Sequence, residues 1–198
     1  VIAAGCLIAQ GVHIGKDCLL HMGVKVLAES QLHDRVILQA GAVIGSDGFG
    51  YAWNGKEHLK IPQVGRVVLH DDVEIGANTC IDRGALGDTV IQKGVKLDNL
   101  IQIGHNVEIG ALTVMASQAG IAGSTTVGKG CQIGGQAAAA GHLNIGDGCQ
   151  LAARTGVISS LDAGGVYAGM PAMPHRAWLK TSALIIRLPE IWKKIKSM

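Results

Sequence analysis

Two of the eight histidines, His105 and His142, are spaced from a glycine, Gly123, in a way that could support acyl transfer. Gly123 follows His105 by 18 residues, and His142 follows His105 by 37 residues. A neutral imidazole can act as a general base, and a backbone amide without a side chain can stabilise an oxyanion. If the fold brings these groups together, they form a base, an oxyanion donor and a substrate clamp. Two solvated histidines in turns explain the same spacing equally well.

The elements that must position these residues come from a six-residue repeat. An aliphatic residue recurs at every sixth position in three blocks: Ile2, Ile8, Ile14, Leu20, Val26, Leu32, Leu38 and Ile44; Leu69, Ile75 and Ile81; and Ile91, Leu97, Ile103, Ile109, Met115, Ile121, Val127, Ile133, Ala139, Ile145, Leu151 and Val157. Period six fits neither an α-helix nor the alternation of a simple strand. It predicts an all-β fold, a parallel β-helix of hexapeptide repeats, over residues 1–160.

Three hexads form one triangular coil of 18 residues, so Gly123 should stack directly on His105. His142 lies two coils and one residue beyond His105, near the same corner. Because adjacent strands lie ~4.8 Å apart, the two imidazoles should be roughly 10 Å apart along the axis. The repeat therefore predicts that both histidines and the glycine lie along one edge of the prism.

Two interruptions break the repeat. Residues 46–66 form an insertion with Phe49, Tyr51 and Trp53, which are half of the six aromatic residues. A loop that breaks a strict solenoid is usually functional or interfacial, although it can simply cover its own sheet. A shorter slip in the repeat occurs around Arg83–Asp88.

After Val157 the pattern decays, and we expect a linker at 161–175 followed by basic helices at 176–198. The first helix should run over 176–188 and end before Pro189, with a second short helix beyond it. This tail has a local charge of +5, whereas the preceding 175 residues carry −3. The tail either caps the open end of the solenoid or docks an acidic partner.

Composition excludes several classes of protein. The net charge of +2 gives no support for nucleic-acid binding, and no apolar run is long enough for a membrane span. The five cysteines are odd in number and lack a CxxC pair, which favours a reducing, cytoplasmic compartment. The absence of a His-x4-His pair argues against the zinc site that some β-helix enzymes carry.

Several motifs together resemble one enzyme family, over nearly the whole chain. They occupy Ile44–Tyr51, Lys60–Arg66, Asp72–Asn78, Ile81–Ala85, Lys96–Asn99 and Ile101–Asn106, and continue in Gly141-His142, Gly165–Tyr167 and Gly169–Pro171. The family is the UDP-3-O-(3-hydroxyacyl)glucosamine N-acyltransferases of lipid A biosynthesis. The resemblance implies a homotrimer of left-handed β-helices with active sites between subunits.

The resemblance also implies the reaction and its partners. The family moves a 3-hydroxyacyl chain from acyl carrier protein to the 2-amino group of a UDP-glucosamine lipid. No metal and no dissociable cofactor is expected, because the donor carries its own phosphopantetheine arm. The resemblance also implies a uridine-binding N-terminal domain, which we expect this sequence to lack. A related β-helix sugar O- or N-acyltransferase and a non-catalytic β-helix binding scaffold are the alternatives.

The resemblance assigns roles residue by residue. The catalytic base falls on His105, the oxyanion amide on Gly123 and the second active-site histidine on His142. The remaining predicted substrate-binding residues are Asp98, Asn99, Asn106 and Gly141. Where the family closes its acyl groove, this chain has the small residues Ala152, Ala153 and Gly156, which predicts a groove deep enough for a long chain.

Overall fold

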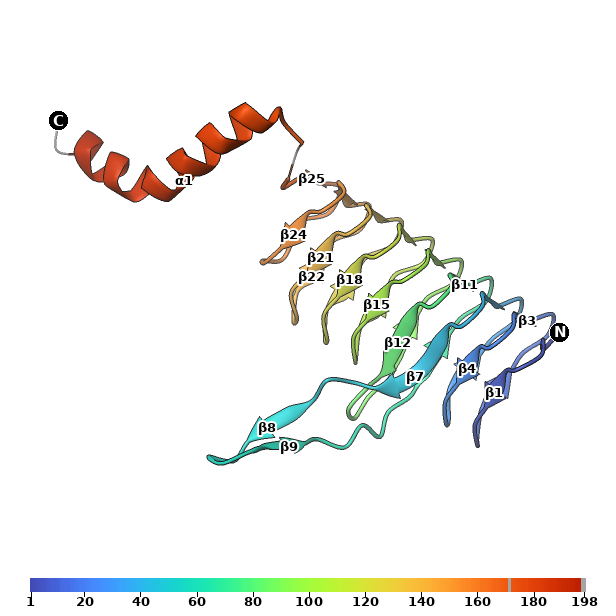
Figure 1. The fold of residues 1–198 in the computed structure, drawn as a ribbon. Helices are drawn as coiled ribbons and strands as arrows, with labels where there is room; N and C mark the ends of the chain where they lie inside the picture. Colours follow the sequence, from blue (N-terminus) through green and yellow to red (C-terminus); the bar gives the residue numbers. More distant parts are fainter. Residues whose placement is uncertain (171, 197–198) are drawn as a thin grey trace.

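The computed structural model describes residues 1–170 and 172–196. Pro171 of the Gly169–Pro171 motif and the last two residues of the expected 176–198 segment lie outside the described residues. The described chain winds into a stack of triangular coils, with an arm on one side and a helix at the C-terminal end (Figure 1). The predicted parallel β-helix is confirmed.

Each coil contributes one short strand to each of three parallel sheets, which we call the first, second and third faces. The first face has eight strands, in stacking order: β1 (Leu7–Ile8), β4 (Lys25–Val26), β7 (Val43–Asp47), β12 (Cys80–Arg83), β15 (Gln102–Ile103), β18 (Gly120–Ile121), β21 (Ala138–Ala139) and β24 (Gly156–Val157). The second face has seven: β2 (His13–Ile14), β5 (Gln31–Leu32), β10 (Val67–Leu69), β13 (Thr89–Ile91), β16 (Glu108–Ile109), β19 (Thr126–Val127) and β22 (Asn144–Ile145).

The third face again has eight strands, in stacking order: β3 (Leu19–Leu20), β6 (Ile37–Leu38), β11 (Glu74–Ile75), β14 (Lys96–Leu97), β17 (Val114–Met115), β20 (Gln132–Ile133), β23 (Gln150–Leu151) and β25 (Val166–Tyr167). The 18-residue stacking step appears directly in the strand register. For example, Ile103 pairs with Ile121, and Ile121 pairs with Ala139.

The repeated aliphatic residues point inward and build the core. Those from Leu20 to Val157 are buried, and each fully buried Leu or Ile contributes about 1.5–3 kcal/mol to stability. Ile2 and Ile8 of the first coil remain exposed, because no coil lies beneath them in the described residues. Cys18, Cys131 and Cys149 are buried free thiols that pack into the core beside the aliphatic columns.

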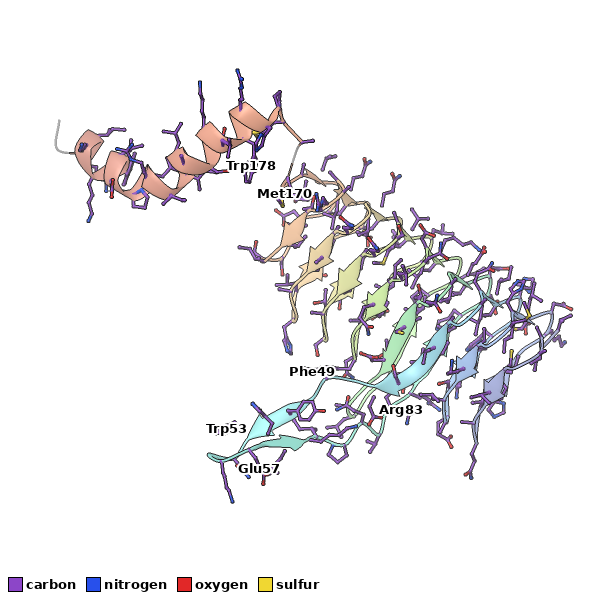
Figure 2. All side chains as sticks on the ribbon, in the orientation of Figure 1. Phe49, Trp53, Glu57, Arg83, Met170 and Trp178 are labelled. Carbon is purple, nitrogen blue, oxygen red and sulfur yellow. The ribbon has the colours of Figure 1, made fainter. Side chains whose placement is uncertain are left out.

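The insertion at 46–66 forms a hairpin arm. Strands β8 (Tyr51–Trp53) and β9 (His58–Lys60) pair antiparallel and project sideways from the stack (Figure 1). Phe49 and Trp53 lie along this arm in Figure 2, with 87% and 60% of their surface exposed. The hairpin of the insertion therefore does not cover its own sheet.

The C-terminal boundaries need two corrections. The β-helix runs past residue 160, because Val166 and Tyr167 pair with β23 and complete another coil within the expected linker. A single helix, α1 (His175–Lys196), replaces the two expected helices. Pro189 lies inside α1, and proline can bend a helix without ending it. Figure 1 shows α1 bent along its length and extending away from the last coil.

None of the residues described in α1 is buried, and its last turn carries Lys193, Lys194 and Lys196. No helix among the described residues has the length and apolar character needed to cross a membrane.

Candidate active site

Most of the predicted site residues meet at one corner of the prism, between the first and second faces. The register of β15, β18 and β21 places His105, Gly123 and Gly141 in one column. Asn106 and His142 follow them by one residue and share the next column, with backbone φ angles of 59° and 60°. The predicted ridge of two imidazoles and a bare glycine therefore exists in the structure.

Backbone hydrogen bonds fix the spacing of this corner. The Ser124 N–H donates to His105 O at 2.9 Å, and the His142 N–H donates to Gly123 O at 3.1 Å. Each bond joins one coil to the next, so His105 and His142 are held two coils apart. His105 is partly buried, whereas His142 is exposed.

The imidazole of His105 lies directly against Gly123. A Cβ built on Gly123 would lie 2.6 Å from His105 Nε2 and 2.7 Å from Cε1, closer than real Cβ atoms approach other atoms. Glycine is therefore required here by the close approach of the ring. The same contact places the Nε2 atom next to the Gly123 backbone.

The side chain of Asn106 determines which nitrogen of His105 can act as a base. Asn106 Oδ1 accepts the Ala85 N–H at 3.0 Å and lies 3.1 Å from His105 Nδ1. Because a backbone amide can only donate, the atom facing it is the carbonyl oxygen, which can only accept. His105 Nδ1 must therefore carry its proton, and Nε2 keeps the lone pair that takes a proton from a substrate.

Asn106 is itself held firmly. Its backbone N–H donates to Thr89 Oγ1 at 2.8 Å, in addition to the side-chain contacts with Ala85 and His105. These contacts give Asn106 a role in orienting the imidazole. That Asn106 binds substrate stays a prediction.

The backbone amide of Gly123 is available as a donor. At the equivalent position of another corner, the Ser117 N–H donates to Asp98 Oδ2 at 3.0 Å. Among the described residues, no carbonyl or side chain accepts a hydrogen bond from the Gly123 N–H. The free amide can stabilise an oxyanion, and the lone pair of the base beside it can remove a proton.

Asp98 and Asn99 lie at a different corner, between the third and first faces. Asp98 accepts hydrogen bonds from the Asn99 and Ser117 backbone amides, and Asn99 Oδ1 accepts the Ala77 N–H at 2.7 Å. Within one chain these two residues therefore lie away from the His105 corner.

A groove of about 810 Å³ runs along the third face from this second corner. Its lining includes Asp98, Asn99 and the column Ala116, Gly134 and Ala152 that continues from Asp98. These residues are small, so the groove stays open over three coils. Of the three small residues expected to deepen a groove, Ala152 lines it. Ala153 is not among the described lining residues, and Gly156 lies on the first face.

The base of the hairpin arm also reaches the His105 corner. A Cβ built on Gly48 would lie 2.6 Å from His105 Cβ and 2.7 Å from Gln63 Oε1. Gln63 is 8% exposed, and its Oε1 has no hydrogen-bond partner among the described residues. The insertion thus packs on the imidazole. The sequence indicates that the insertion can be functional or interfacial, but it does not indicate this contact.

Asp82 is a further residue near this corner to which sequence reasoning gives no role. It accepts hydrogen bonds from Ser46 Oγ at 2.6 Å and Gln102 Nε2 at 3.0 Å. Burial raises the pKa of Asp82, and the two hydrogen bonds oppose that shift. Its signal in the sequence is its place in the Ile81–Ala85 motif. Among the described residues, no group of three or more His, Cys, Asp or Glu side chains could hold a metal ion.

Comparison with known proteins identifies relatives. Residues 11–46 match the bacterial transferase hexapeptide family of six repeats. The UDP-3-O-acylglucosamine N-acyltransferase of Anaeromyxobacter dehalogenans strain 2CP-1 is 50% identical over 204 residues, covering 100% of this chain and 58% of that protein. Its namesake from Syntrophotalea carbinolica is 59% identical over 157 residues, covering 79% and 46%. The chain thus spans about half the length of these curated relatives.

Solved structures share the fold. The UDP-N-acetylglucosamine acyltransferase of Francisella novicida matches with a TM-score of 0.76 at 18% identity, over 89% of this chain and 65% of that one. The enzyme of that name from Campylobacter jejuni matches with a TM-score of 0.69 at 18% identity, over 81% and 68%. The β-helix is accordingly left-handed, as expected. The chain belongs to the hexapeptide-repeat acyltransferases and is homologous over its whole length to UDP-3-O-acylglucosamine N-acyltransferases.

Proposed function

We propose that the protein transfers a 3-hydroxyacyl chain from acyl carrier protein to the 2-amino group of UDP-3-O-(3-hydroxyacyl)glucosamine. The observation that carries the proposal is the contact of the His105 ring with Gly123. The chain that makes this contact is 50% identical to a UDP-3-O-acylglucosamine N-acyltransferase. His105 Nε2 has a free lone pair, and the Gly123 N–H has no acceptor among the described residues. These are the two groups that attack of an amine on a thioester requires.

The reaction needs no covalent acyl-enzyme. The neutral amine attacks the thioester carbon, forming the C–N bond while the carbonyl oxygen becomes an oxyanion near the Gly123 amide. His105 Nε2 takes the proton from the amine, and collapse of the intermediate breaks the C–S bond. His105 then returns the proton to the departing thiolate, so the enzyme ends unchanged. We assign His142 and Gly141, further along the same ridge, to positioning the donor.

The proposal includes a homotrimer. Asp98, Asn99 and the groove of about 810 Å³ lie at a different corner from His105 in one chain. A second protomer packed against the first brings its groove to this His105, so that each site draws on two chains. We also propose a cytoplasmic location, which the five free cysteines support.

The test is direct. The protein is incubated with 3-hydroxyacyl carrier protein and the 2-amino acceptor, and the product is analysed by mass spectrometry. The expected product has gained one hydroxyacyl group on nitrogen. Acylation of UDP-N-acetylglucosamine, whose amine is blocked, would instead indicate an O-acyltransferase, and no transfer to either acceptor would leave a binding scaffold.

The groove predicts a chain-length preference. The wild-type protein should prefer long hydroxyacyl donors, because Ala116, Gly134 and Ala152 leave the groove open. Ala152→Phe should place a ring in it and shift the preference to shorter chains, with kcat/KM for the longest donor falling roughly 10-fold or more, since each CH₂ left unburied costs about 0.8 kcal/mol. Competition between donors of different length measures the shift. Leu112→Phe, which is exposed on another corner, is the control, and an unchanged preference in Ala152→Phe would show that the chain binds elsewhere.

The basic last turn of α1 predicts how the donor protein docks. Charge reversal at Lys193, Lys194 and Lys196 should raise the KM for acyl carrier protein several-fold, while kcat changes little, because exposed charges chiefly affect encounter. The effect should shrink as salt increases. Steady-state kinetics at two ionic strengths measure it, and an unchanged KM would assign the helix to a structural role.

A further inference from the structure

Asp82 is a partly buried carboxylate held by neutral groups. Ser46 Oγ donates to its Oδ1 at 2.6 Å, and Gln102 Nε2 donates to its Oδ2 at 3.0 Å. Within the described ranges, Asp82 forms no ion pair with lysine or arginine. Removing a carboxylate from water without a counter-ion costs free energy, so the presence of Asp82 at this position needs an explanation.

The position of Asp82 relates it to His105. Ile81 and Ile103 are paired residues on neighbouring coils, so Asp82 lies one coil below the turn that carries His105. Gln102, which bonds to Asp82, belongs to β15, the strand that leads into His105. A positive charge on His105 lowers the pKa of Asp82.

The other charged groups around Asp82 are already paired or carry no positive charge. The neighbouring Arg83 is directed away, because its guanidinium donates to Gly45 O at 2.8 Å and to Ala28 O at 2.6 Å. Asp47, at the end of β7, is paired with Lys60. Cys80 is a thiol whose pKa is raised by burial and by the charge of Asp82. Of the two charged groups with the largest effect on the pKa of Asp82, Asp47 is an anion and His105 can become positive.

We propose that Asp82 is a positioning residue for the base, whose carboxylate stabilises the imidazolium formed when His105 takes the proton from the amine. The inference rests on the proposed function and deepens it. Ser46 and Gln102 hold the carboxylate in place by hydrogen bonds that leave its charge intact. The counter-ion that Asp82 lacks in the resting protein is thus created at Nε2 during the reaction.

The test is Asp82→Asn, which keeps the size of the side chain and removes its charge. We expect kcat to fall roughly 10- to 100-fold with little change in KM for the acceptor. The acid limb of the kcat/KM profile should move to lower pH, because an imidazole without a nearby anion is harder to protonate. Asp82→Glu, which keeps the charge, should restore part of the rate and the position of the acid limb.

Two further variants separate this role from a structural one. Asp147→Asn removes a carboxylate that caps the Lys129 amide at another corner, and it should change neither kcat nor the acid limb. Ser46→Ala removes one hydrogen bond and keeps the charge, so the acid limb should stay in place. If Asp82→Asn lowers kcat without moving the acid limb, Asp82 is merely structural and the proposal is wrong.

A readout without turnover distinguishes this proposal from the proposed function. The NMR titration of His105, followed in selectively labelled protein, should have a lower midpoint in Asp82→Asn than in the wild type. An unchanged midpoint overturns the role of Asp82 even if acyl transfer is observed. A lowered midpoint in a protein that transfers no acyl group would uphold the pairing and refute the proposed reaction.

Discussion

His105→Ala should lower turnover by roughly two to four orders of magnitude while leaving the β-helix folded. The variant removes Nε2, the atom whose lone pair is left free by the contact between Nδ1 and Asn106. The core should be unaffected, because His105 lies at a corner outside the aliphatic columns. Single-turnover transfer from hydroxyacyl carrier protein measures the rate, and circular dichroism with thermal melting monitors the fold.

The comparison variant is His142→Ala, on the same ridge two coils away. Because His142 is exposed and is assigned to positioning the donor, its loss should raise KM more than it lowers kcat, and the total effect should be smaller. Near-normal rates in His105→Ala would refute the proposal. A larger loss in His142→Ala would indicate that the roles of the two histidines are exchanged.

Gly123→Ala should lower kcat by at least about 100-fold, although it adds a single methyl group. The new Cβ would lie 2.6 Å from His105 Nε2, so the imidazole has to move away from the position in which Asn106 holds it. The substitution also places a methyl group beside the amide that should stabilise the oxyanion, and the loss of one such donor typically costs 10²–10³ in kcat. Base and oxyanion donor are thus disturbed together.

Gly120→Ala is the matched control. Gly120 lies three residues earlier in the same coil, and a Cβ built there meets nothing within 4 Å. Its stability and activity should stay close to those of the wild type. The same assays and melting curves apply to both variants. If Gly123→Ala retains full activity, the close approach of ring and glycine has no catalytic importance.

The hexapeptide repeat makes much of the site predictable from the residues alone. A strict period of six residues fixes which residues share a column, so His105, Gly123 and Gly141 can be aligned by counting. The same counting separates Asp98 and Asn99 from His105 within one chain. These predictions hold because the third block of the repeat runs without interruption from Ile91 to Val157.

The remaining features of the site depend on contacts that the repeat does not predict. The tautomer of His105 follows from the Ala85 amide, which lies in the slip at 83–88 and so has no fixed register in the repeat. The contact of Asp82 with Ser46 follows a register shift between Ile81 and Asp82. The packing of Gly48 on His105 requires the insertion to fold back at its base, for which the sequence offers no periodic signal.

The C-terminal errors have a physical cause as well. The hexad pattern weakens after Val157, yet the open end of a β-helix still exposes unpaired strand groups, and Val166 and Tyr167 satisfy some of them by pairing with β23. Proline often terminates a helix, but a helix can also continue past it, as α1 continues past Pro189.

A structure of the protein with the 2-amino acceptor bound would show whether His105 is placed to act as the base. We expect the acceptor nitrogen to lie within about 2.6–3.2 Å of His105 Nε2. The Gly123 N–H should face the space next to that nitrogen, where the thioester carbonyl of the donor has to lie. An acceptor bound with its amine at another corner, or with His105 turned toward solvent, would rule out His105 as the base.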